Sequence, residues 1–474
     1  MREKHGEQYT YAQTHFVENV RELIDADELD VPVAIAGRLL GRRNQGNLVF
    51  GDVDDLTGKI QIIADTETTP ELDELANLNI GDWVGITGQT GKSKRGEPSI
   101  YVSDWRRLAA TELPFPDKHS GLTDTDTIYR QRYLDLATNR ESMNRFRQRS
   151  KIVSFIRRSL EEQDFIEVET PMLQSIYGGA AAKPFETHHN ALDQEMYLRI
   201  APELYLKRLV VGGLQRVFEI GRVFRNEGMS TRHNPEFTMI EVYAALWDYE
   251  KQMELTENLV AALSMELHGT TTIEYQGREV DLSAPWERKT MDELVSAEVG
   301  EDVSIDSGVD HLRALCDLHD VPYETGYGPG KLLLELYEKL CEGNLWGPIF
   351  VTDYPVEVSP LARDHRSRPG YTERFEGIVA GREMCNGYTE LNDPKIQYER
   401  FLSEEDASEY DDEAMKMDFD YIRALKYGLP PTAGLGIGID RLAMLLTNAA
   451  SIRDVVLFPT MRPDGYRTSY DLNT

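Results

Sequence analysis

The 474-residue sequence predicts an α+β protein of several domains, in which a small N-terminal β-barrel precedes a larger unit of sheet and helices. Three observations carry this prediction. The chain is too long for one ordinary hydrophobic core. Residues 31–108 form short β-rich runs separated by Gly and Asp turns. Beyond residue 141, stretches with helical spacing of apolar residues alternate with stretches of strand-like alternation.

The N-terminal region begins with a predicted helix over Thr14–Ala26, whose apolar residues recur at helical spacing. A short helical stretch, Leu72–Ala76, lies between the third and fourth β-rich runs. Five short strands with a helix in this position are typical of an OB-type barrel, although other small β-barrels share the pattern. The predicted strands are Val31–Leu40, Gly46–Val53, Lys59–Ala64, Asp82–Gly88 and Ser99–Leu108.

The composition is that of a globular protein, with 41% hydrophobic and 28% charged residues. No stretch approaches the ~20 apolar residues of a membrane span. Met1–Gln13 is polar and lacks the apolar region of a secretory signal, so we expect a cytoplasmic protein without a membrane partner. The three cysteines are too scattered for a disulfide framework or a zinc cluster.

The net charge is −31, from 82 acidic and 51 basic residues. By itself this balance argues against a nucleic-acid partner, because phosphate binding requires clustered Lys and Arg. The acidity has two explanations of similar weight, a salty cytoplasm in which acidic surfaces aid solubility and an ordinary acidic bacterial enzyme. The distribution of the charge is more informative than its sum.

The predicted barrel holds a local excess of basic residues. Phe50 lies beside a Gly-Asp turn, where it is placed to stack on a base. OB folds bind single strands through a basic groove and aromatic stacking. The alternative is that the charges are solvated and Phe50 belongs to the core, but the local excess in so acidic a chain favours nucleic acid. The basic residues are Arg38, Arg42, Arg43, Lys59, Lys92, Lys94, Arg95, Arg106 and Arg107.

A linker separates the barrel from the rest of the chain. Leu113–Gln131 contains two prolines followed by a polar run. We therefore expect an N-terminal domain over 1–112, a linker over 113–140 and a second domain over 141–474.

The second domain begins with a predicted helix that starts at Glu141 and ends near Gln163. Phe165–Leu173 follows as a predicted strand closed by Pro171. Further on, Thr270–Pro348 reads as mixed strand and helix without a chemical motif, so we expect an insertion with packing roles.

Arg216–Trp247 is predicted to be a β-hairpin, because two alternating runs flank a polar segment. Alternate side chains of a strand point to opposite faces. One face presents apolar side chains to a core: Phe218, Ile220, Phe224, Ile240, Val242 and Leu246. The other face collects cations, rings and carboxylates, which suits a phosphorylated aromatic ligand better than a solvated sheet surface: Arg225, Glu227, Phe237, Glu241 and Tyr243.

A second hairpin is predicted over Phe375–Asn392. A turn at Ala380-Gly381 pairs Ile378 with Glu383 and Glu376 with Cys385, which makes the two glutamates diagonal neighbours. Carboxylates this close favour a cation between them, and Mg²⁺ often combines one or two carboxylates with substrate phosphates. The alternative is two exposed acids.

The residues that follow Glu383 in this hairpin are polar at alternate positions. Asn386, Tyr388 and Glu390 share one face, and bringing them to the face of Glu383 requires a bulge.

Gly434, Gly436 and Gly438 alternate along a predicted strand, which leaves one face flat enough for a planar base to approach the backbone. Arg441 then opens a helix and points at this floor. The spacing differs from a dinucleotide-binding fingerprint, and the run closes a late strand instead of opening a βαβ unit.

These stretches together resemble the motifs of class II aminoacyl-tRNA synthetases. Phe-Arg-Asn-Glu-Gly at 224–228 followed by Arg-His-Asn-Pro-Glu-Phe at 232–237 resembles motif 2, near 216–247. The helix–strand–proline element resembles motif 1, near 150–173, and the glycine-rich strand resembles motif 3, near 428–446. The resemblance implies a catalytic domain built on an antiparallel sheet flanked by helices, with the insertion near 268–348.

The carboxylates left over once ATP is accommodated indicate the amino acid. Glu203, Glu241 and Glu390 suit a substrate with two cationic groups, since a buried ammonium needs paired charge and acceptors. The wider likeness agrees, because four stretches resemble class II lysyl-tRNA synthetases closely and the similarity covers nearly the whole chain. They are Ala201–Leu209, Arg232–Tyr243, Arg382–Asp393 and Gly428–Leu442.

The resemblance implies roles for individual residues. The lysine site comprises Gly179, Glu203, Glu241, Tyr243, Asn386, Tyr388 and Glu390. ATP, a co-substrate, contacts Arg225, Glu227, Arg232, His233, Asn234, Phe237, Gly438 and Arg441, of which Arg225 and Arg441 are catalytic. Mg²⁺ binds Glu376 and Glu383. The anticodon of tRNA(Lys) meets Arg38, Phe50, Gln61 and Glu97, and Pro171 marks a homodimer interface. The departures are a short N-terminal segment without a polybasic arm, and Met384-Cys385 in place of smaller or aliphatic residues.

The implied reaction attaches L-lysine to tRNA through a lysyl-adenylate, with release of pyrophosphate and AMP. Two other functions remain open: a paralogue that lysylates a protein or small molecule, and a regulatory RNA-binding protein without catalysis. The barrel argues against the first, and joint retention of Arg225, Glu376, Glu383 and Arg441 argues against the second. An aspartyl or asparaginyl relative is disfavoured because Glu241 and Glu390 would repel an acidic substrate.

Overall fold

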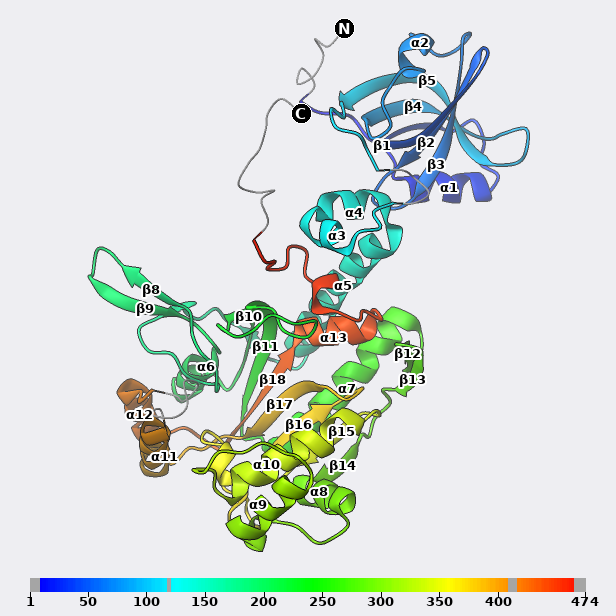
Figure 1. Cartoon of the computed structure of the whole chain (residues 1–474). Helices are drawn as coiled ribbons and strands as arrows, with labels where there is room; N and C mark the ends of the chain where they lie inside the picture. Colours follow the sequence, from blue (N-terminus) through cyan, green and yellow to red (C-terminus); the bar gives the residue numbers. More distant parts are fainter. Residues whose placement is uncertain (1–8, 117–120, 408–415, 464–474) are drawn as a thin grey trace. The chain divides into compact units, whose positions relative to one another are not determined.

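The structure, a computed structural model, describes residues 9–116, 121–407 and 416–463. It divides into two compact units, Met1–Asn139 and Arg140–Thr474, which are described separately (Figure 1). The first unit ends at the close of the predicted linker. Part of that linker is helical, because α3 (Thr125–Arg130) and α4 (Arg132–Thr138) lie within 113–140. Asp124 caps α3 by accepting a hydrogen bond from the backbone N–H of Thr127 at 2.8 Å.

The N-terminal unit contains a closed five-stranded barrel in the order β1-β2-β3-β5-β4, so the predicted barrel is confirmed. Helices α1 (Val17–Asp25) and α2 (Leu72–Leu75) accompany it. Alternation places Val33, Ile35 and Leu39 in its core. The strands are β1 (Pro32–Gln45), β2 (Leu48–Asp54), β3 (Lys59–Asp65), β4 (Trp83–Lys92) and β5 (Pro98–Ala109).

The C-terminal unit is built on an eight-stranded sheet that is antiparallel except at its two outermost pairs. Its strands in spatial order are β14 (Glu287–Thr290), β15 (Ile349–Thr352), β16 (Arg374–Ile378), β17 (Glu383–Thr389), β18 (Thr432–Gly438), β11 (Glu236–Ala245), β10 (Arg216–Phe224) and β6 (Ile166–Glu167). The smaller sheets contain β7 (Leu173–Gln174), β8 (Glu186–His189), β9 (Gln194–Leu198), β12 (Thr272–Tyr275) and β13 (Arg278–Asp281).

One face of the large sheet forms the main hydrophobic core. Ile156 of α5 (Arg140–Glu161), Leu263 of α7 (Tyr249–His268) and Leu442 of α13 (Ile439–Leu446) are fully buried against Phe218 and Ile437 of the sheet. On the opposite face, Leu204, Val217 and Tyr243 belong to a smaller hydrophobic cluster. The remaining helices are α6 (Glu203–Val211), α8 (Met291–Val299), α9 (Val309–Leu318), α10 (Pro329–Leu340), α11 (Pro394–Ala407) and α12 (Phe419–Lys426).

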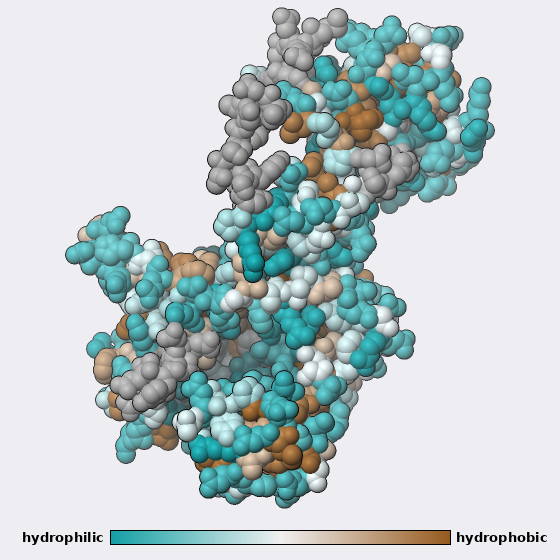
Figure 2. Space-filling view, in the orientation of Figure 1, coloured by the Kyte–Doolittle hydropathy of each residue, from teal (hydrophilic) through white to brown (hydrophobic). Residues whose placement is uncertain are grey.

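The predicted insertion contributes structure as well as packing. It supplies β14 to the edge of the large sheet, and its helices α8, α9 and α10 form a separate core with β15. Leu312, Leu332 and Leu336 are completely buried there. Figure 2 shows a visible face covered mostly by hydrophilic side chains with smaller hydrophobic patches between them, in keeping with the net charge of −31.

The predicted hairpin forms, and its register separates the two faces that the alternation predicted. Phe218 lies opposite Val242 and Ile220 opposite Ile240 on the core side, while Glu219 lies opposite Glu241 on the other side. Two side chains near strand ends differ from expectation. Phe224 is only partly buried. Leu246 is 72% exposed because β11 ends at Ala245 and the backbone turns left-handed at Leu246, with φ of 65°.

The strand predicted over Phe165–Leu173 is wrong as a single element. Only β6 pairs with β10, and β7 belongs to a different three-stranded sheet. Pro171 lies between them and has no N–H to donate to a ladder, so the chain leaves the large sheet there.

Among the described residues, no helix is both long and apolar enough to cross a membrane.

Candidate active site

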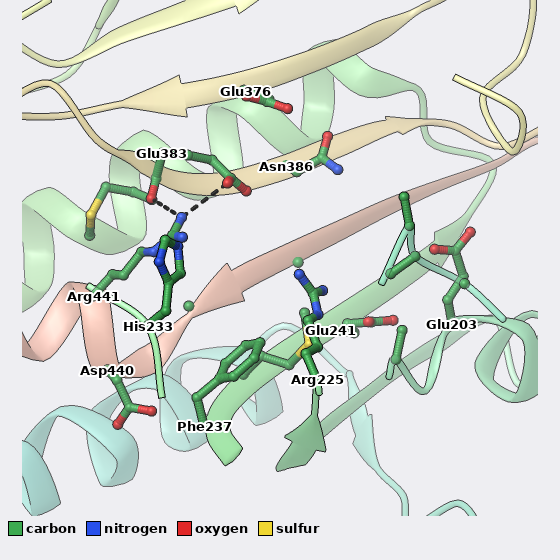
Figure 3. A pocket seen from close by; sticks show the side chains of 18 of the residues that line it. Glu203, Arg225, His233, Phe237, Glu241, Glu376, Glu383, Asn386, Asp440 and Arg441 are labelled. Atoms are coloured by element: carbon green, nitrogen blue, oxygen red, sulfur yellow. Dashed lines mark hydrogen bonds and ion pairs between the residues drawn. The ribbon is translucent and has the colours of Figure 1, made fainter. Parts of the chain in front are cut away.

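A pocket of about 340 Å³ opens on the polar face of the large sheet (Figure 3). Its walls come from β10, β11, β16, β17 and β18, the loop after β10, and the segment that includes Gly179. All residues predicted for ATP and magnesium line it, as do all but one of those predicted for lysine: Gly179, Glu203, Arg225, Glu227, Arg232, His233, Asn234, Phe237, Glu241, Tyr243, Glu376, Glu383, Asn386, Tyr388, Gly438 and Arg441. The exception is Glu390.

Arg225 carries a largely buried positive charge on this pocket. Its guanidinium carbon lies 5.2 Å from the centre of the Phe237 ring. Its Nε is buried and has no hydrogen-bond partner among the described residues. Burial lowers the pKa of Arg225, although Glu383 and Glu227 oppose that effect. A buried, incompletely paired guanidinium next to an aromatic ring is suited to a phosphate attached to a planar base.

Arg441 lies at the opposite side of the same region. Its Nη1 donates to a carboxylate oxygen of Glu383 at 3.0 Å and to the Glu383 backbone carbonyl at 2.8 Å (Figure 3). The neighbouring Asp440 fixes the start of α13, since it accepts from Arg149 at 2.6 Å and from the Thr238 backbone N–H at 2.7 Å. Helix α13 therefore presents Arg441 to the pocket from a rigid base.

The polar loop between β10 and β11 is held by its own side chains. Ser230 Oγ accepts from the backbone N–H groups of Arg232 and His233 at 3.0 Å each. Burial, and next the charge of Arg441, lowers the pKa of His233. Asn234 donates to the Glu236 carbonyl at 2.6 Å, and its Oδ1 accepts from the Thr460 N–H at 3.1 Å, so this side chain also anchors a distant segment.

The second hairpin forms with one difference in register. Ile378 lies opposite Glu383 as predicted, but Glu376 lies opposite Asn386 instead of Cys385. The shift falls between Gly377 and Ile378 and is the irregularity that the alternation required. The extra residue lets Glu383 and Asn386 line the same pocket as Glu376.

Glu376 and Glu383 have opposite electrostatic environments. Burial, reinforced by the charge of Glu383, raises the pKa of Glu376 to about 7. Burial also opposes ionisation of Glu383, but Arg441, Arg225 and Arg374 outweigh it and lower its pKa. Arg374 donates to Glu376 at 2.7 Å. Two carboxylates that influence each other's ionisation in a partly buried pocket fit a divalent cation.

Within the described residues, no group of three or more His, Cys, Asp and Glu side chains forms a metal cage. Two carboxylates such as Glu376 and Glu383 suit Mg²⁺, which commonly takes its other ligands from substrate oxygens and water.

The other end of the pocket is rich in carboxylates and phenols. Tyr243 donates to Glu241 at 2.9 Å, and Tyr388 donates to Glu203 at 2.6 Å. Burial, and next the charge of Glu203, raises the pKa of Glu241 well above its usual value. A cation that enters the pocket stabilises the ionised form of such a carboxyl group, so this end of the pocket suits an ammonium group.

Glu390 lies behind the pocket wall instead of lining it. Its Oε2 accepts from Lys207 Nζ at 2.7 Å, and its Oε1 is buried without a hydrogen-bond partner among the described residues. A Cβ placed on Gly434 would come within 2.0 Å of that Oε1. Gly434 lines the pocket and has no side chain, so only its backbone separates this Glu390 oxygen from the pocket.

The glycine-rich strand has the predicted two faces. Gly434, Gly436 and Gly438 line the pocket, while Leu435 and Ile437 are at most 2% exposed on the core side. A Cβ on Gly436 would meet the Met239 methyl at 3.2 Å. The floor is therefore flat because the strand lacks side chains on this face.

Comparison with known proteins agrees with this geometry. A family model described as tRNA synthetases class II (D, K and N) matches residues 124–462, and one described as OB-fold nucleic acid binding domain matches residues 33–108. The lysine--tRNA ligase of Neisseria gonorrhoeae strain FA 1090 is 51% identical over 451 residues, which cover 93% of this chain and 89% of that protein. This chain belongs to the lysine--tRNA ligases of class II.

Other members of the family are similarly close. The lysine--tRNA ligase of Synechococcus strain CC9605 is 51% identical and covers 94% of this chain and 90% of its own length. The Clostridium tetani protein with the same name is 48% identical over 457 residues, covering 95% of this chain and 91% of that protein.

In this lysine--tRNA ligase the barrel brings together only some of the residues predicted for the anticodon. Phe50 on β2 lies opposite the exposed Arg43 on β1, and Gln61 on β3 is a diagonal neighbour on the same outer face. Arg38 lies five residues before Arg43 on β1, opposite Asp54 of β2.

The remaining predicted anticodon residues have other contacts or positions. The guanidinium of Arg38 donates to the Gly81 carbonyl at 2.7 Å and packs over the Trp83 and Phe115 rings. Glu97 is exposed in the turn before β5. Part of the predicted basic surface is also engaged within the barrel, since Lys92 pairs with Asp27 at 2.9 Å.

Sequence reasoning missed two residues of this ligase's site. Arg374 lines the pocket and holds Glu376, and its place two residues before Glu376 on β16 was the available signal. Lys207 pairs with Glu203 at 2.7 Å, and their i,i+4 spacing on a helix predicts that pair. Nothing local to Lys207 indicates its second partner, Glu390.

Proposed function

We propose that this protein attaches L-lysine to tRNA(Lys) in two steps. The lysine carboxylate attacks the α-phosphate of ATP, giving lysyl-adenylate and pyrophosphate. The terminal ribose hydroxyl of the tRNA then attacks the adenylate and releases AMP. The observation that carries this proposal is a single pocket that holds the incompletely paired guanidinium of Arg225 together with Glu203 and Glu241, with Glu390 directly behind its wall.

ATP occupies the end formed by β10, β11 and α13. Phe237 stacks on the adenine, and Arg225 and Arg441 stabilise charge on the phosphates during transfer. Arg232 reaches the terminal phosphate from the loop. The other ATP contacts are Glu227, His233, Asn234 and Gly438. No protein nucleophile is required, because catalysis consists of positioning and electrostatic stabilisation.

Lysine occupies the carboxylate-rich end. Glu203, Glu241 and the Gly179 carbonyl hold the α-ammonium, and Tyr243 and Glu390 hold the ε-ammonium. Asn386 and Tyr388 complete the pocket. The buried Oε1 of Glu390 has no partner in the described structure, and an ammonium hydrogen would satisfy it.

Glu376 and Glu383 would hold Mg²⁺. When bound there with ATP, the ion neutralises phosphate charge and orients the phosphates for displacement. The raised pKa of Glu376 supports this role, since a nearby cation stabilises its ionised form.

The barrel reads the anticodon through Phe50 and Gln61, with Arg38 and Glu97 at its margins. The exposed Arg43 beside Phe50 supports a nucleic-acid contact at this face. Recognition of the tRNA anticodon thus belongs to the barrel domain over 1–112, and adenylation belongs to the catalytic domain over 141–474. The segment 113–140 links the two domains. We expect the protein to act in the cytoplasm with the rest of translation.

A homodimer forms around the region of Pro171. Three large apolar side chains there are substantially exposed in the isolated chain, namely Ile166 (50%), Met172 (46%) and Leu173 (50%). Exposed apolar side chains that gather in one region mark association surfaces.

Lysine-dependent exchange of pyrophosphate into ATP tests the proposal. We expect exchange with lysine and little with the other amino acids when each is supplied separately. Charging should follow when tRNA(Lys) is added. Exchange with a different amino acid would overturn the substrate assignment. Lysine exchange without tRNA charging would favour an enzyme that lysylates another acceptor.

A further inference from the structure

Lys207 is a fully buried cation at the lysine end of the pocket, and the reaction proposed above gives it no role. Its Nζ lies 2.7 Å from Glu203 and 2.7 Å from Glu390, and its side chain is 0% exposed. Two aromatic rings are also close to the ammonium group: the centroids of the Tyr388 and Tyr421 rings lie 5.9 Å and 5.4 Å from Nζ.

The two ion pairs of Lys207 hold the carboxylates of Glu203 and Glu390 in defined positions. Oε2 of Glu390 accepts from Lys207, while Oε1 is buried next to Gly434 and has no hydrogen-bond partner in the part of the chain that the structure describes. Glu203 receives a second hydrogen bond from Tyr388 at 2.6 Å, on the same Oε1 that pairs with Lys207. Both carboxylates are thereby fixed before any substrate arrives.

The net charge of the residues at this end of the pocket then matches the two ammonium groups of free lysine. Glu203, Glu241 and Glu390 contribute three negative charges when ionised, and Lys207 contributes one positive charge. Two negative charges remain, and free lysine brings two ammonium groups to this end. Without the internal cation, three buried carboxylates would face two cations, and one of them would take up a proton.

We propose that Lys207 is a positioning residue for lysine recognition, which pins Glu390 so that its free oxygen accepts the substrate ε-ammonium and which balances the third carboxylate. The proposal rests on the function proposed above. It concerns the residue that orients Glu390, because Lys207 itself does not line the pocket.

The pH dependence of lysine binding reports on this arrangement. Burial raises the pKa of Glu390, whereas Lys207 lowers it and Glu203 raises it. Removing the internal cation therefore makes Glu390 harder to ionise. The charged and titratable groups that face Glu390 are Glu203 and Lys207 of α6, Glu241 and Tyr243 of β11, Tyr388 of β17 and Tyr421 of α12.

The test compares Lys207→Met with Lys207→Arg in the full-length protein by lysine-dependent pyrophosphate exchange. For Lys207→Met we expect the lysine KM to rise roughly 100-fold, because a misplaced carboxylate contacts the ammonium poorly. The ATP KM and the kcat should change little, since the lost contact stabilises ground state and transition state alike. The pH at which lysine binding improves should move upward. Lys207→Arg keeps the charge and should recover part of the affinity.

Controls separate this role from folding and from the proposed function. Lys251→Met removes an exposed lysine paired with Glu254 on α7 and should behave like the parent. If Lys207→Met does not fold, Lys207→Gln keeps a hydrogen-bond donor without the charge and should also raise the lysine KM. A lysine KM within about threefold of the parent value in a folded neutral variant would overturn the inference. So would an equal rise in the KM values of ATP and lysine. A parent enzyme without lysine-dependent exchange would instead overturn the proposed function.

Discussion

Glu390 is the residue on which we expect lysine specificity to depend most. Its free Oε1 is buried under Gly434, so an ε-ammonium that reaches it exchanges water for a charged hydrogen bond. Glu390→Gln removes that charge and should lower kcat/KM for lysine by about two orders of magnitude, from ~1.5–3 kcal/mol of charged hydrogen bonding plus mispositioning. Pyrophosphate exchange measures the effect. Near-normal activation of lysine by this variant would exclude the assignment.

The same residue predicts how lysine binding depends on pH. Burial raises the pKa of Glu390 to about 8. Ionisation of this carboxyl group is therefore incomplete near neutral pH in the free pocket, while the ionised form is the one that pairs with Lys207 and with a substrate ammonium. Lysine KM should fall roughly tenfold as pH rises from about 6.5 to about 8.5, with release of a proton on binding. Exchange assays across this range test it, with Glu390→Gln as a variant whose KM should stay flat.

At the scale of elements, strand β18 controls access to Glu390. An alanine Cβ at Gly434 would lie 2.0 Å from Glu390 Oε1 and 2.6 Å from the Tyr243 ring, so both side chains must shift. Gly434→Ala should raise the lysine KM by roughly 100-fold through this misplacement, with a smaller effect on the ATP KM. Gly347→Ala is a matched control, because nothing lies within 4 Å of its added Cβ. Equal losses in the two variants would contradict the role given to the strand.

The barrel is the element expected to read tRNA. Adenylation needs only the residues that line the pocket, and all of these lie after residue 141. Phe50→Ala should leave lysine-dependent exchange almost unchanged and weaken charging of tRNA(Lys) by roughly one to two orders of magnitude, from a stacking energy of ~1–3 kcal/mol. Assays at limiting tRNA and several salt concentrations measure it. Unchanged charging would favour the enzyme that lysylates another acceptor.

For the whole molecule, the exposed apolar side chains near Pro171 predict a stable homodimer. Ile166, Met172 and Leu173 are each about half exposed in the isolated chain, at 50%, 46% and 50%. Introducing a charge by Met172→Glu should weaken association, because an unpaired charge buried at an interface is costly. Sedimentation velocity at micromolar concentration measures the oligomeric state. A fully active parent monomer would rule out a required dimer.

Local pattern in the sequence was sufficient for the barrel and for the two faces of the strands at the site, whereas the roles of individual site residues came from the family resemblance. Alternation along β11 and β18 separates core from pocket side chains, because a strand sends neighbouring residues to opposite faces. It therefore placed Glu241, Tyr243 and the glycine floor correctly. The same rule failed at Leu246 and Pro171, where a left-handed residue and a missing N–H end the pairing.

Most of the residues that face the pocket can be predicted from the sequence, although Arg374 was missed and Glu390 lies behind the wall. How these residues pair is visible only in the folded protein. Glu203 and Lys207 are neighbours on one helix, as their spacing predicts. The contact between Lys207 and Glu390 spans 183 positions and exists only because folding brings α6 to the residue that follows β17. The exact register of Glu376 likewise depends on a bulge. Periodicity fixes the direction of a side chain within its own element, whereas the distance between elements is set by packing.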